Sequence, residues 1–375
     1  MNLPHLPGYM CALRGTGLSP VRSLVGGSAV HAEHKKFGGF VMKRLVALFV
    51  AVGLICGLAL STAPTAGAAT VIKMAGMKPE GEPETIGMHL FGKYLKELSN
   101  GKYEVQVFPN SQLGKEDAYI AATRKGIIQM CATGTQTSAL HPAMAMLETP
   151  MLFDNLDHAR RAMEGKTFDL INEGFTEKSG LRTLNAFPLG FRHFYSKKPI
   201  KDVKDLEGMR MRVPNIPLYT NFAKECGISG QPMPFAEVPG ALDQGVIDGG
   251  DSPLADIVSL KMYEITPEIS LSGHILVIHS LYINDKFFKS LPEQDQKWIE
   301  EAAKRSADDV WAMVADGDEK AKATILANKG NIHEPSKELH EHLVNAGKRS
   351  WKLFYDTVPN AQAILDSADS YRESK

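Results

Sequence analysis

The sequence lacks the motifs that identify several common classes of enzyme. It has no nucleophile elbow, no P-loop, no GxGxxG after a predicted strand, no CxxC pair and no HExxH motif. No internal repeat or heptad array is present either. These absences argue against the hydrolases, nucleotide-binding enzymes, redox proteins and zinc proteases that carry such motifs.

Cysteine is scarce, and positive charge is not in excess. Only Cys131 and Cys226 follow residue 68, 95 positions apart and in different predicted domains, so we expect two buried free thiols rather than a disulfide. Residues 1–68 hold six Lys or Arg and one Glu, so the remaining 307 residues carry a net charge of −6. A mildly acidic surface argues against nucleic acid or an anionic membrane as the partner.

A long hydrophobic run occurs only near the N-terminus, inside residues 42–68. A basic start (Met42 to Arg44) precedes the apolar run Leu45 to Leu60, and Ala66-Gly67-Ala68 follows it. This layout predicts a secretory signal peptide cleaved after Ala68, and a retained membrane helix is the weaker alternative because the run is short. We expect residues 1–41 to be an artefactual extension, with a disordered leader as the alternative.

After residue 69, apolar patterns of period 2 and period 3.6 alternate along the chain. The first three strands and two helices follow a β-α-β-α-β order, which predicts a parallel or mixed sheet covered by helices. An uninterrupted helical pattern over Pro292 to Ala327 predicts a helix long enough to span two domains. The third of these strands is predicted over Ile127 to Ala132. Further predicted strands are Leu181 to Phe187, Phe191 to Ser196, Met209 to Val213 and His274 to Ile283.

Arg212 is the strongest candidate binding residue. It lies next to last on the strand Met209 to Val213, just before Pro214 ends the strand. An arginine at the end of a strand can present its planar fork to a cleft, and that fork suits bidentate binding of a carboxylate. An ordinary surface arginine is the alternative for a lone residue of this type.

Two further positions suggest an anion site. Arg192 lies in a strand between Phe191 and His193, where its charge needs a partner such as a bound anion. The segment Asp248 to Pro253 (DGGDSP) is predicted to be a Gly-rich loop in which Asp251 and Ser252 offer polar groups at a helix N-terminus. A plain N-cap by Ser252 is the alternative there.

Two other clusters are interpreted as structural. His333, His340 and His342 lie near Glu334 and Glu341 in a predicted polar helix, which a solvated helix face explains better than a metal site. The methionines between residues 144 and 151 are expected to fill the core.

Together these motifs resemble one protein family along the whole chain after residue 69. The resemblance rests on VFPNSQLG (107–114), GFR (190–192), GMRMRVP (208–214), AEVPGALDQGVIDG (236–249) and LPE (291–293). In this order and at this spacing the chain resembles a DctP-type substrate-binding protein of a tripartite ATP-independent periplasmic (TRAP) transporter.

The resemblance implies an α/β, two-lobed fold of the periplasmic-binding-protein type, with mixed sheets flanked by helices and a long helix across both lobes. Residues 70–189 with 278–317 would form one lobe, and residues 190–277 with 318–375 the other. It also implies that Arg212 binds a ligand carboxylate, with Arg192 as a second contact. The family often has Glu-Asn-Pro where this chain has Asp251-Ser252-Pro253, so no particular ligand can be transferred.

Weaker pocket candidates are Glu116, Tyr219 and Tyr282, with packing an equal alternative for the two tyrosines. The expected function is capture of an organic acid anion, such as a C4-dicarboxylate or a related acid, in the periplasm and its delivery to an integral membrane permease. No cofactor and no metal are expected, and the chain is a monomer or a homodimer. The alternatives are a ligand-sensing periplasmic protein and a secreted enzyme acting on a carboxylated substrate.

Overall fold

The computed structural model describes residues 69–373. Within this range the strands join in one sheet of order β2-β1-β3-β9-β5-β8-β6-β7, and β10 and β4 also pair with β9. Parallel pairs β1–β2, β1–β3, β6–β7 and β6–β8 are combined with antiparallel pairs made by β5 and β9, so the sheet is mixed. The strands are β1 Thr70–Ala75, β2 Tyr103–Phe108, β3 Met130–Thr133, β4 Leu181–Thr183, β5 Phe187–Ser196, β6 Arg210–Val213, β7 Ser229–Pro232, β8 Gly249–Pro253, β9 Glu268–Asn284 and β10 Asn331–His333.

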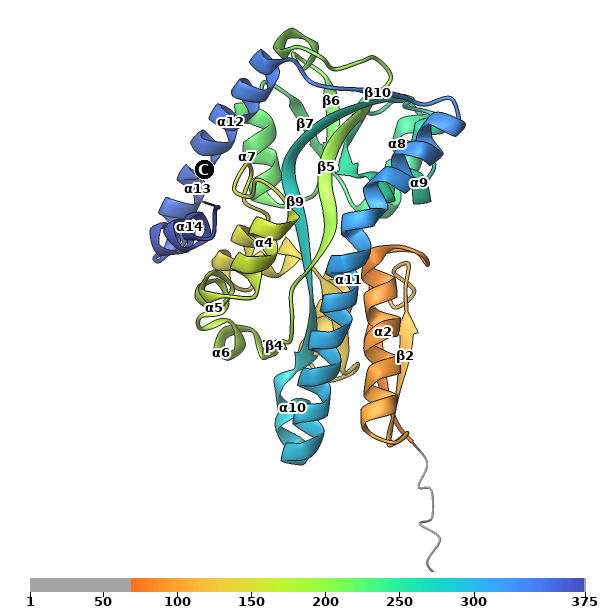
Figure 1. Cartoon of the computed structure of the whole chain (residues 1–375), viewed down its shortest axis with the longest axis vertical. Coiled ribbons are helices and arrows are strands. Elements are labelled where there is room, and N and C mark those ends of the chain that lie inside the picture. The colour runs from red at the N-terminus through yellow and green to blue at the C-terminus, as the bar shows by residue number, and fades with distance from the viewer. Residues whose placement is uncertain (1–68, 374–375) are drawn as a thin grey trace, which may run out of the picture. The chain divides into compact units, whose positions relative to one another are not determined.

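The fold has two lobes joined by long shared elements. We call β1 to β4 with α2 and α3 the first lobe, and β6 to β8 with α7 to α9 the second lobe. β9 pairs with β3 and β4 through its last residues and with β10 through its first residues, while β5 runs antiparallel to it from Glu268 to His279. β9 therefore continues from one lobe into the other without a break, as Figure 1 shows.

Helices cover the sheet and bury its apolar side chains. α2, for example, buries Met88, Phe91 and Leu95 and begins with Pro83 in its first turn, where a missing N–H costs nothing. The helices are α2 Pro83–Leu98, α3 Glu116–Arg124, α4 Leu156–Met163, α5 Lys166–Asn172, α6 Phe175–Ser179, α7 Pro217–Glu225, α8 Val238–Asp243, α9 Leu254–Ser259, α10 Asp285–Ser290, α11 Glu293–Ala327, α12 Lys337–Ser350, α13 Lys352–Thr357 and α14 Ala361–Ser370. Short 3-10 helices include η2 Thr135–Ala139, η3 Pro142–Glu148 and η5 Phe235–Glu237.

The predicted long helix is confirmed as α11, which has 35 residues. It packs against α2 in the first lobe, against α9 in the second lobe and against β5 between them, and Figure 1 shows it running past both. The limits of the two lobes predicted from the sequence stay a prediction, since β5, β9 and α11 belong to both. Near the C-terminus, α12 packs on α7 and β9, and α14 packs on α4 and α5.

The prediction of a loop over Asp248 to Pro253 is wrong for residues 249 to 253. Gly249–Pro253 is the buried strand β8, which pairs with β5 on one side and β6 on the other. A β-carbon on Gly249 would lie 2.2 Å from the Tyr195 carbonyl oxygen, and one on Gly250 would lie 2.3 Å from the Tyr195 hydroxyl oxygen. The two glycines permit close approach of neighbouring strands rather than a turn. The strand predicted from Ile127 likewise begins only at Met130, and Ile127 is exposed.

Three smaller expectations have direct outcomes. Cys131 and Cys226 are buried free thiols, as predicted, and Met144 and Met146 are in the core. His333 is not on a helix but on β10, where it contacts Glu268, and no cluster of metal-ligating residues is found in the described part of the chain.

Among residues 69–373, no helix has both the length and the apolar character needed to cross a membrane. The predicted signal peptide (42–68) and extension (1–41) lie outside the described residues.

Candidate anion-binding site

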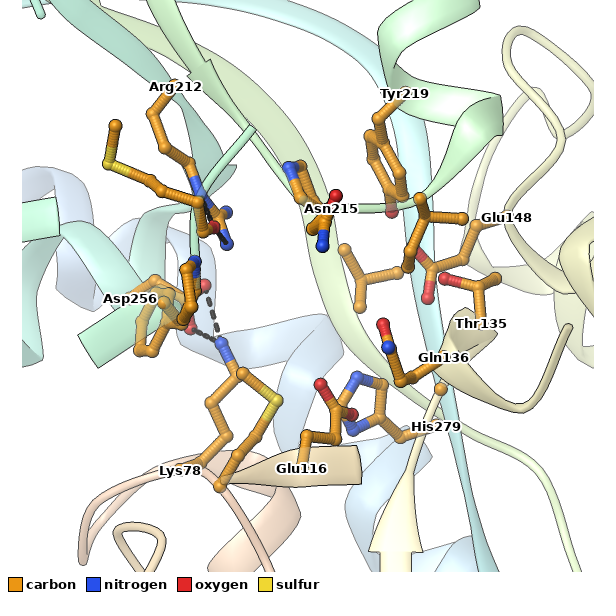
Figure 2. Close-up of a pocket in the computed structure, with 18 of the residues that line it drawn as sticks. Lys78, Glu116, Thr135, Gln136, Glu148, Arg212, Asn215, Tyr219, Asp256 and His279 are labelled. Carbon is orange, nitrogen blue, oxygen red and sulfur yellow. Dashed lines mark hydrogen bonds and ion pairs between the residues drawn. The ribbon is translucent and has the colours of Figure 1, made fainter. Parts of the chain in front are cut away.

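Residues from both lobes line one cavity with an empty volume of about 810 Å³, part of it open to solvent. Its walls come from segments that follow the carboxyl ends of parallel strands: β1 and β3 in the first lobe, and β6 and β7 in the second lobe. β5 and β9 form its floor. Ligands in α/β proteins commonly bind at such strand ends, because the loops there are free to vary. Figure 2 shows the polar side chains that point into this space.

Arg212 lies in the cavity wall at the end of β6 and is only 4% exposed. Its Nε and Nη2 donate hydrogen bonds to the carbonyl oxygen of Met233 at 3.2 and 3.1 Å, and no ion pair joins it to a carboxylate in the described residues. Burial, followed by the charge of Arg192, lowers the pKa of Arg212 below its ordinary value. The cavity wall thus contains a buried positive charge whose counter-ion must come from elsewhere.

Arg192, on β5, already has a protein partner. Its Nε donates to Oδ2 of Asp251 at 2.6 Å and its Nη2 to Oδ1 at 3.0 Å, and its guanidinium lies 4.9 Å from the centre of the Tyr219 ring. Burial alone would lower the pKa of Arg192, but the Asp251 carboxylate raises it above its ordinary value. Asp251 is therefore the partner that the charge of Arg192 was expected to need, and Arg192 still lines the cavity.

His274 completes the buried network around Asp251. Its Nε2 lies 3.0 Å from Oδ2 of Asp251 and its Nδ1 lies 2.8 Å from the hydroxyl of Ser272, while its ring stacks on Phe194 and Phe222. Burial is the main cause that lowers the pKa of His274, so the ring is neutral. Because an ionised carboxylate only accepts hydrogen bonds, Nε2 carries the proton and Nδ1 accepts from Ser272.

The structure brings together four of the six predicted site residues. Arg212, Arg192, Glu116 and Tyr219 line the cavity; Asp251 and Ser252 do not, because β8 holds them behind Arg192. The alternative role of Ser252 as an N-cap is also wrong: the cap position of α9 is Pro253, and the Ser252 hydroxyl is buried without a hydrogen-bond partner among the described residues. Tyr282 is fully buried against Phe175 and lies outside the cavity wall.

Several polar residues of the cavity wall, most of them on the first-lobe side, were not predicted from the sequence. Glu148 and His279 were the detectable ones, since each directly follows an apolar run, AMAML before Glu148 and ILVI before His279. Lys78 and Asp256 are 178 positions apart, so no local pattern links them. The other polar lining residues that were not predicted are Lys115, Asp117, Thr135, Gln136 and Asn215.

Glu148 and His279 are buried in the first-lobe wall. Burial raises the pKa of Glu148 to about 7, although His279 and Arg192 act in the opposite direction. Nδ1 of His279 donates a hydrogen bond to Oε2 of Glu84 at 2.6 Å. Burial lowers the pKa of His279, but Glu84 more than offsets this and the net pKa is raised. Glu116 accepts a hydrogen bond from the Thr133 hydroxyl, and its pKa is raised by burial.

The two lobes also contact each other directly beside the cavity. Lys78, after β1, donates from Nζ to both oxygens of Asp256 on α9 at 2.7 Å, and both side chains are buried. The Ser259 hydroxyl on α9 contacts Glu82, whose pKa is raised well above its ordinary value by burial and by the charge of Asp256. An exposed pair, Lys115 with Glu237, joins the lobes nearer the solvent.

Comparison with known proteins identifies the family. Residues 74–357 match the model of bacterial extracellular solute-binding protein family 7 (DctP). This match covers more than half of the chain, so the chain belongs to that family of solute-binding proteins, as its sequence motifs indicated. Members of the family bind solutes and are not enzymes.

Solved structures and a curated relative support this assignment. A TRAP periplasmic solute-binding protein from Desulfovibrio desulfuricans, with bound sn-glycerol 3-phosphate, is 97% identical and covers 81% of this chain and 100% of its own, with a TM-score of 0.78. Another from Haemophilus influenzae RdAW, with bound L-gulonate, is 30% identical over 80% of this chain and 99% of its own, with a TM-score of 0.77. The 2,3-diketo-L-gulonate-binding periplasmic protein YiaO of Escherichia coli is 30% identical over 64% of this chain and 73% of its own.

Proposed function

We propose that this protein captures a small hydroxylated organic anion in the cavity between its lobes, with sn-glycerol 3-phosphate as the first candidate. The observation that carries the proposal is the buried Arg212 guanidinium, which lines the cavity without a carboxylate partner in the described residues. A bound anion would supply that partner through charge-assisted hydrogen bonds, each contributing roughly 1.5–3 kcal/mol.

The candidate ligand comes from the comparisons. The 97% identical protein was solved with sn-glycerol 3-phosphate, and the 30% identical one with L-gulonate. Both ligands have one acidic group and several hydroxyl groups. A phosphate monoester extends the expectation from the sequence, which named carboxylates, because an arginine fork binds either group.

The cellular setting is part of the same proposal. The signal peptide at residues 42–68 would direct the mature chain to the periplasm, and Arg212, Arg192, Glu116 and Tyr219 would contact the ligand there. The ligand-bound protein would then deliver its cargo to the integral membrane subunits of a TRAP permease. Uptake of labelled sn-glycerol 3-phosphate by cells that express these subunits should require this protein.

Binding is tested with residues 69–375, unfolded and refolded to remove any carried-over ligand. A ligand at a hundred times its dissociation constant adds roughly 2.7 kcal/mol of stability, which raises the melting temperature of a chain of this size by about 5 °C. We expect such a shift with sn-glycerol 3-phosphate or L-gulonate and none with glycerol. If calorimetry and thermal shift show no binding of any organic phosphate or sugar acid, the proposal is wrong.

A further inference from the structure

The cavity is electrically asymmetric. On one side, the charges of Lys78 and Arg192 are matched by Asp256 and Asp251, which leaves the charge of Arg212 unmatched. On the other side, three carboxylates line the wall, those of Glu148, Glu116 and the exposed Asp117, and Figure 2 shows Glu148 across the cavity from Arg212. None of these three carboxylates forms an ion pair in the part of the chain that the structure describes.

Two polar atoms of this wall lie close together with hydrogen-bonding capacity to spare. A β-carbon on Gly134 would lie 2.8 Å from Oε1 of Glu148 and 2.9 Å from Nε2 of His279. Gly134 itself lines the cavity, and the missing side chain leaves both atoms uncovered there. Glu148 is 2% exposed and His279 is 5% exposed, and the one hydrogen bond recorded for the His279 ring among the described residues uses Nδ1.

A hydroxyl group fits this pair of atoms better than a charged group does. The hydroxyl can donate a hydrogen bond to the Glu148 carboxylate and, because Glu84 favours the protonated His279 ring, accept one from Nε2 of His279, which satisfies both buried atoms at once. A second carboxylate on the ligand could not donate to Glu148 and would lie beside two negative charges, where like-charge contact costs several kcal/mol.

We propose that Glu148 and Glu116, with Nε2 of His279, form an acidic wall that selects ligands having one anionic group at Arg212 and hydroxyl groups at the far end, and that rejects dianions with an acid at each end. This inference rests on the proposed function, since it assumes that an anion occupies the Arg212 side. It disfavours the C4-dicarboxylates that the sequence left open.

Matched ligand pairs test the wall in the unaltered protein. One pair is sn-glycerol 3-phosphate and the 3-phosphoglycerate of the same configuration at C2, in which a carboxylate replaces the terminal hydroxymethyl group. The other pair is L-gulonate and the aldarate formed by oxidising its C6. At pH 8, where the Glu148 carboxylate is ionised, we expect calorimetry to show about 100-fold weaker binding of the doubly acidic member of each pair.

Variants test whether the acidic wall causes the discrimination between singly and doubly acidic ligands. Glu148→Gln should reduce the ratio of the affinity for the hydroxylated ligand to the affinity for the diacid about tenfold, because binding of the hydroxylated ligand weakens and binding of the diacid strengthens. Glu116→Gln should act in the same direction, which covers the case that Glu148→Gln does not fold. Glu104, an exposed acid on β2 that does not line the cavity, is the matched acidic control, and Glu104→Gln should change the ratio less because water screens its charge.

The outcomes separate the two proposals. If both members of each pair bind equally well, or if Glu104→Gln acts as strongly as Glu148→Gln, the acidic wall is refuted while anion capture stands. If neither the single nor the double acids bind, the proposed function fails and the wall fails with it.

Discussion

Arg210 and Arg212 lie two residues apart on β6 in opposite environments. Arg210 is exposed and forms a bidentate pair with Asp248, which also contacts its backbone. Arg212 is buried and reaches only a backbone carbonyl among the described residues. The first arginine joins two strands at the surface, whereas the second is available to a ligand.

Arg212→Lys keeps the positive charge but removes the planar fork. We expect the affinity for sn-glycerol 3-phosphate or L-gulonate to fall by about 10- to 100-fold in calorimetry, since one or two charge-assisted hydrogen bonds are lost. Arg210→Lys is the control on the same strand and should bind normally. Equal losses in the two variants would mean that strand stability, not the fork, controls binding.

Arg212→Met should separate binding from stability. Removing a buried charge that has no counter-ion in the ligand-free protein should leave the melting temperature of that form unchanged or higher, while binding is lost. Thermal unfolding without ligand measures this. A fall of several degrees would show that the hydrogen bonds to Met233 stabilise the second lobe more than the buried charge destabilises it.

The pH dependence of binding reports on Glu148. Its pKa of about 7 means that it is largely protonated at pH 5.5 and ionised at pH 8.5; a nearby anionic ligand favours the protonated form. The affinity for the aldarate of L-gulonate, whose second carboxylate would lie beside Glu148 and does not titrate in this range, should therefore fall as pH rises through 7. The charged groups facing Glu148 are His279 on β9, Arg192 on β5 and Glu116 on α3.

Glu148→Gln distinguishes these groups. His279 also loses charge as pH rises, because its pKa is raised by Glu84, and this weakens anion binding in the same direction. If Glu148 dominates, the variant has a much flatter profile between pH 5.5 and 8.5. An unchanged slope would assign the effect to His279.

At the scale of the secondary-structure element, the helices and strands that could be predicted are those whose apolar residues repeat periodically. α2, α11 and the apolar part of β9 were found because their side chains repeat at 3.6 or 2 residues. β8 was missed because Gly249 and Gly250 resemble turn residues unless their close neighbours on β5 are known. Arg212 was predictable from its place before Pro214, whereas Lys78 depends on a partner 178 residues away.

Two glycines should respond in opposite ways to alanine. Gly190, on β5 between its two register shifts, has φ of +118°, and a β-carbon there would lie 3.3 Å from Cβ of Pro253. Gly190→Ala should lower the free energy of unfolding by about 1–3 kcal/mol. Gly317, inside α11, has open space around it, so Gly317→Ala should raise stability by about 0.5–1 kcal/mol.

Chemical denaturation of both variants checks this prediction, with far-UV circular dichroism to confirm the native fold. A neutral Gly190→Ala would mean that β5 can relax at this position. A destabilising Gly317→Ala would show that α11 needs the glycine for a bend between the lobes.

At the scale of the whole molecule, β5, β9 and α11 join the lobes covalently, while Lys78 and Asp256 join them across the cavity. This buried pair should hold the lobes together in the ligand-free protein. Lys78→Met leaves the Asp256 carboxylate buried without its ammonium partner, which typically costs about 3–5 kcal/mol. We expect a larger radius of gyration by small-angle X-ray scattering and a lower melting temperature.

Lys115→Met is the matched control, since the Lys115–Glu237 pair also joins the lobes but is exposed to water. Its radius and melting temperature should stay close to those of the unaltered protein. The double variant Lys78→Met/Asp256→Leu should recover most of the lost stability because neither charge is then left alone. No recovery would show that the pair acts through a specific geometry rather than through charge balance.

The burial of both cysteines has a practical consequence. Cys131 is on β3 in the first lobe and Cys226 follows α7 in the second lobe, and burial raises the pKa of both thiols, that of Cys131 to about 12. Since the thiolate is the reactive form, maleimide dyes should not modify the native protein at neutral pH. In a protein of residues 69–375, one new surface cysteine on each lobe would then be the only labelled positions. Those residues are therefore ready for use as a fluorescent reporter of their own ligand, without removal of either thiol.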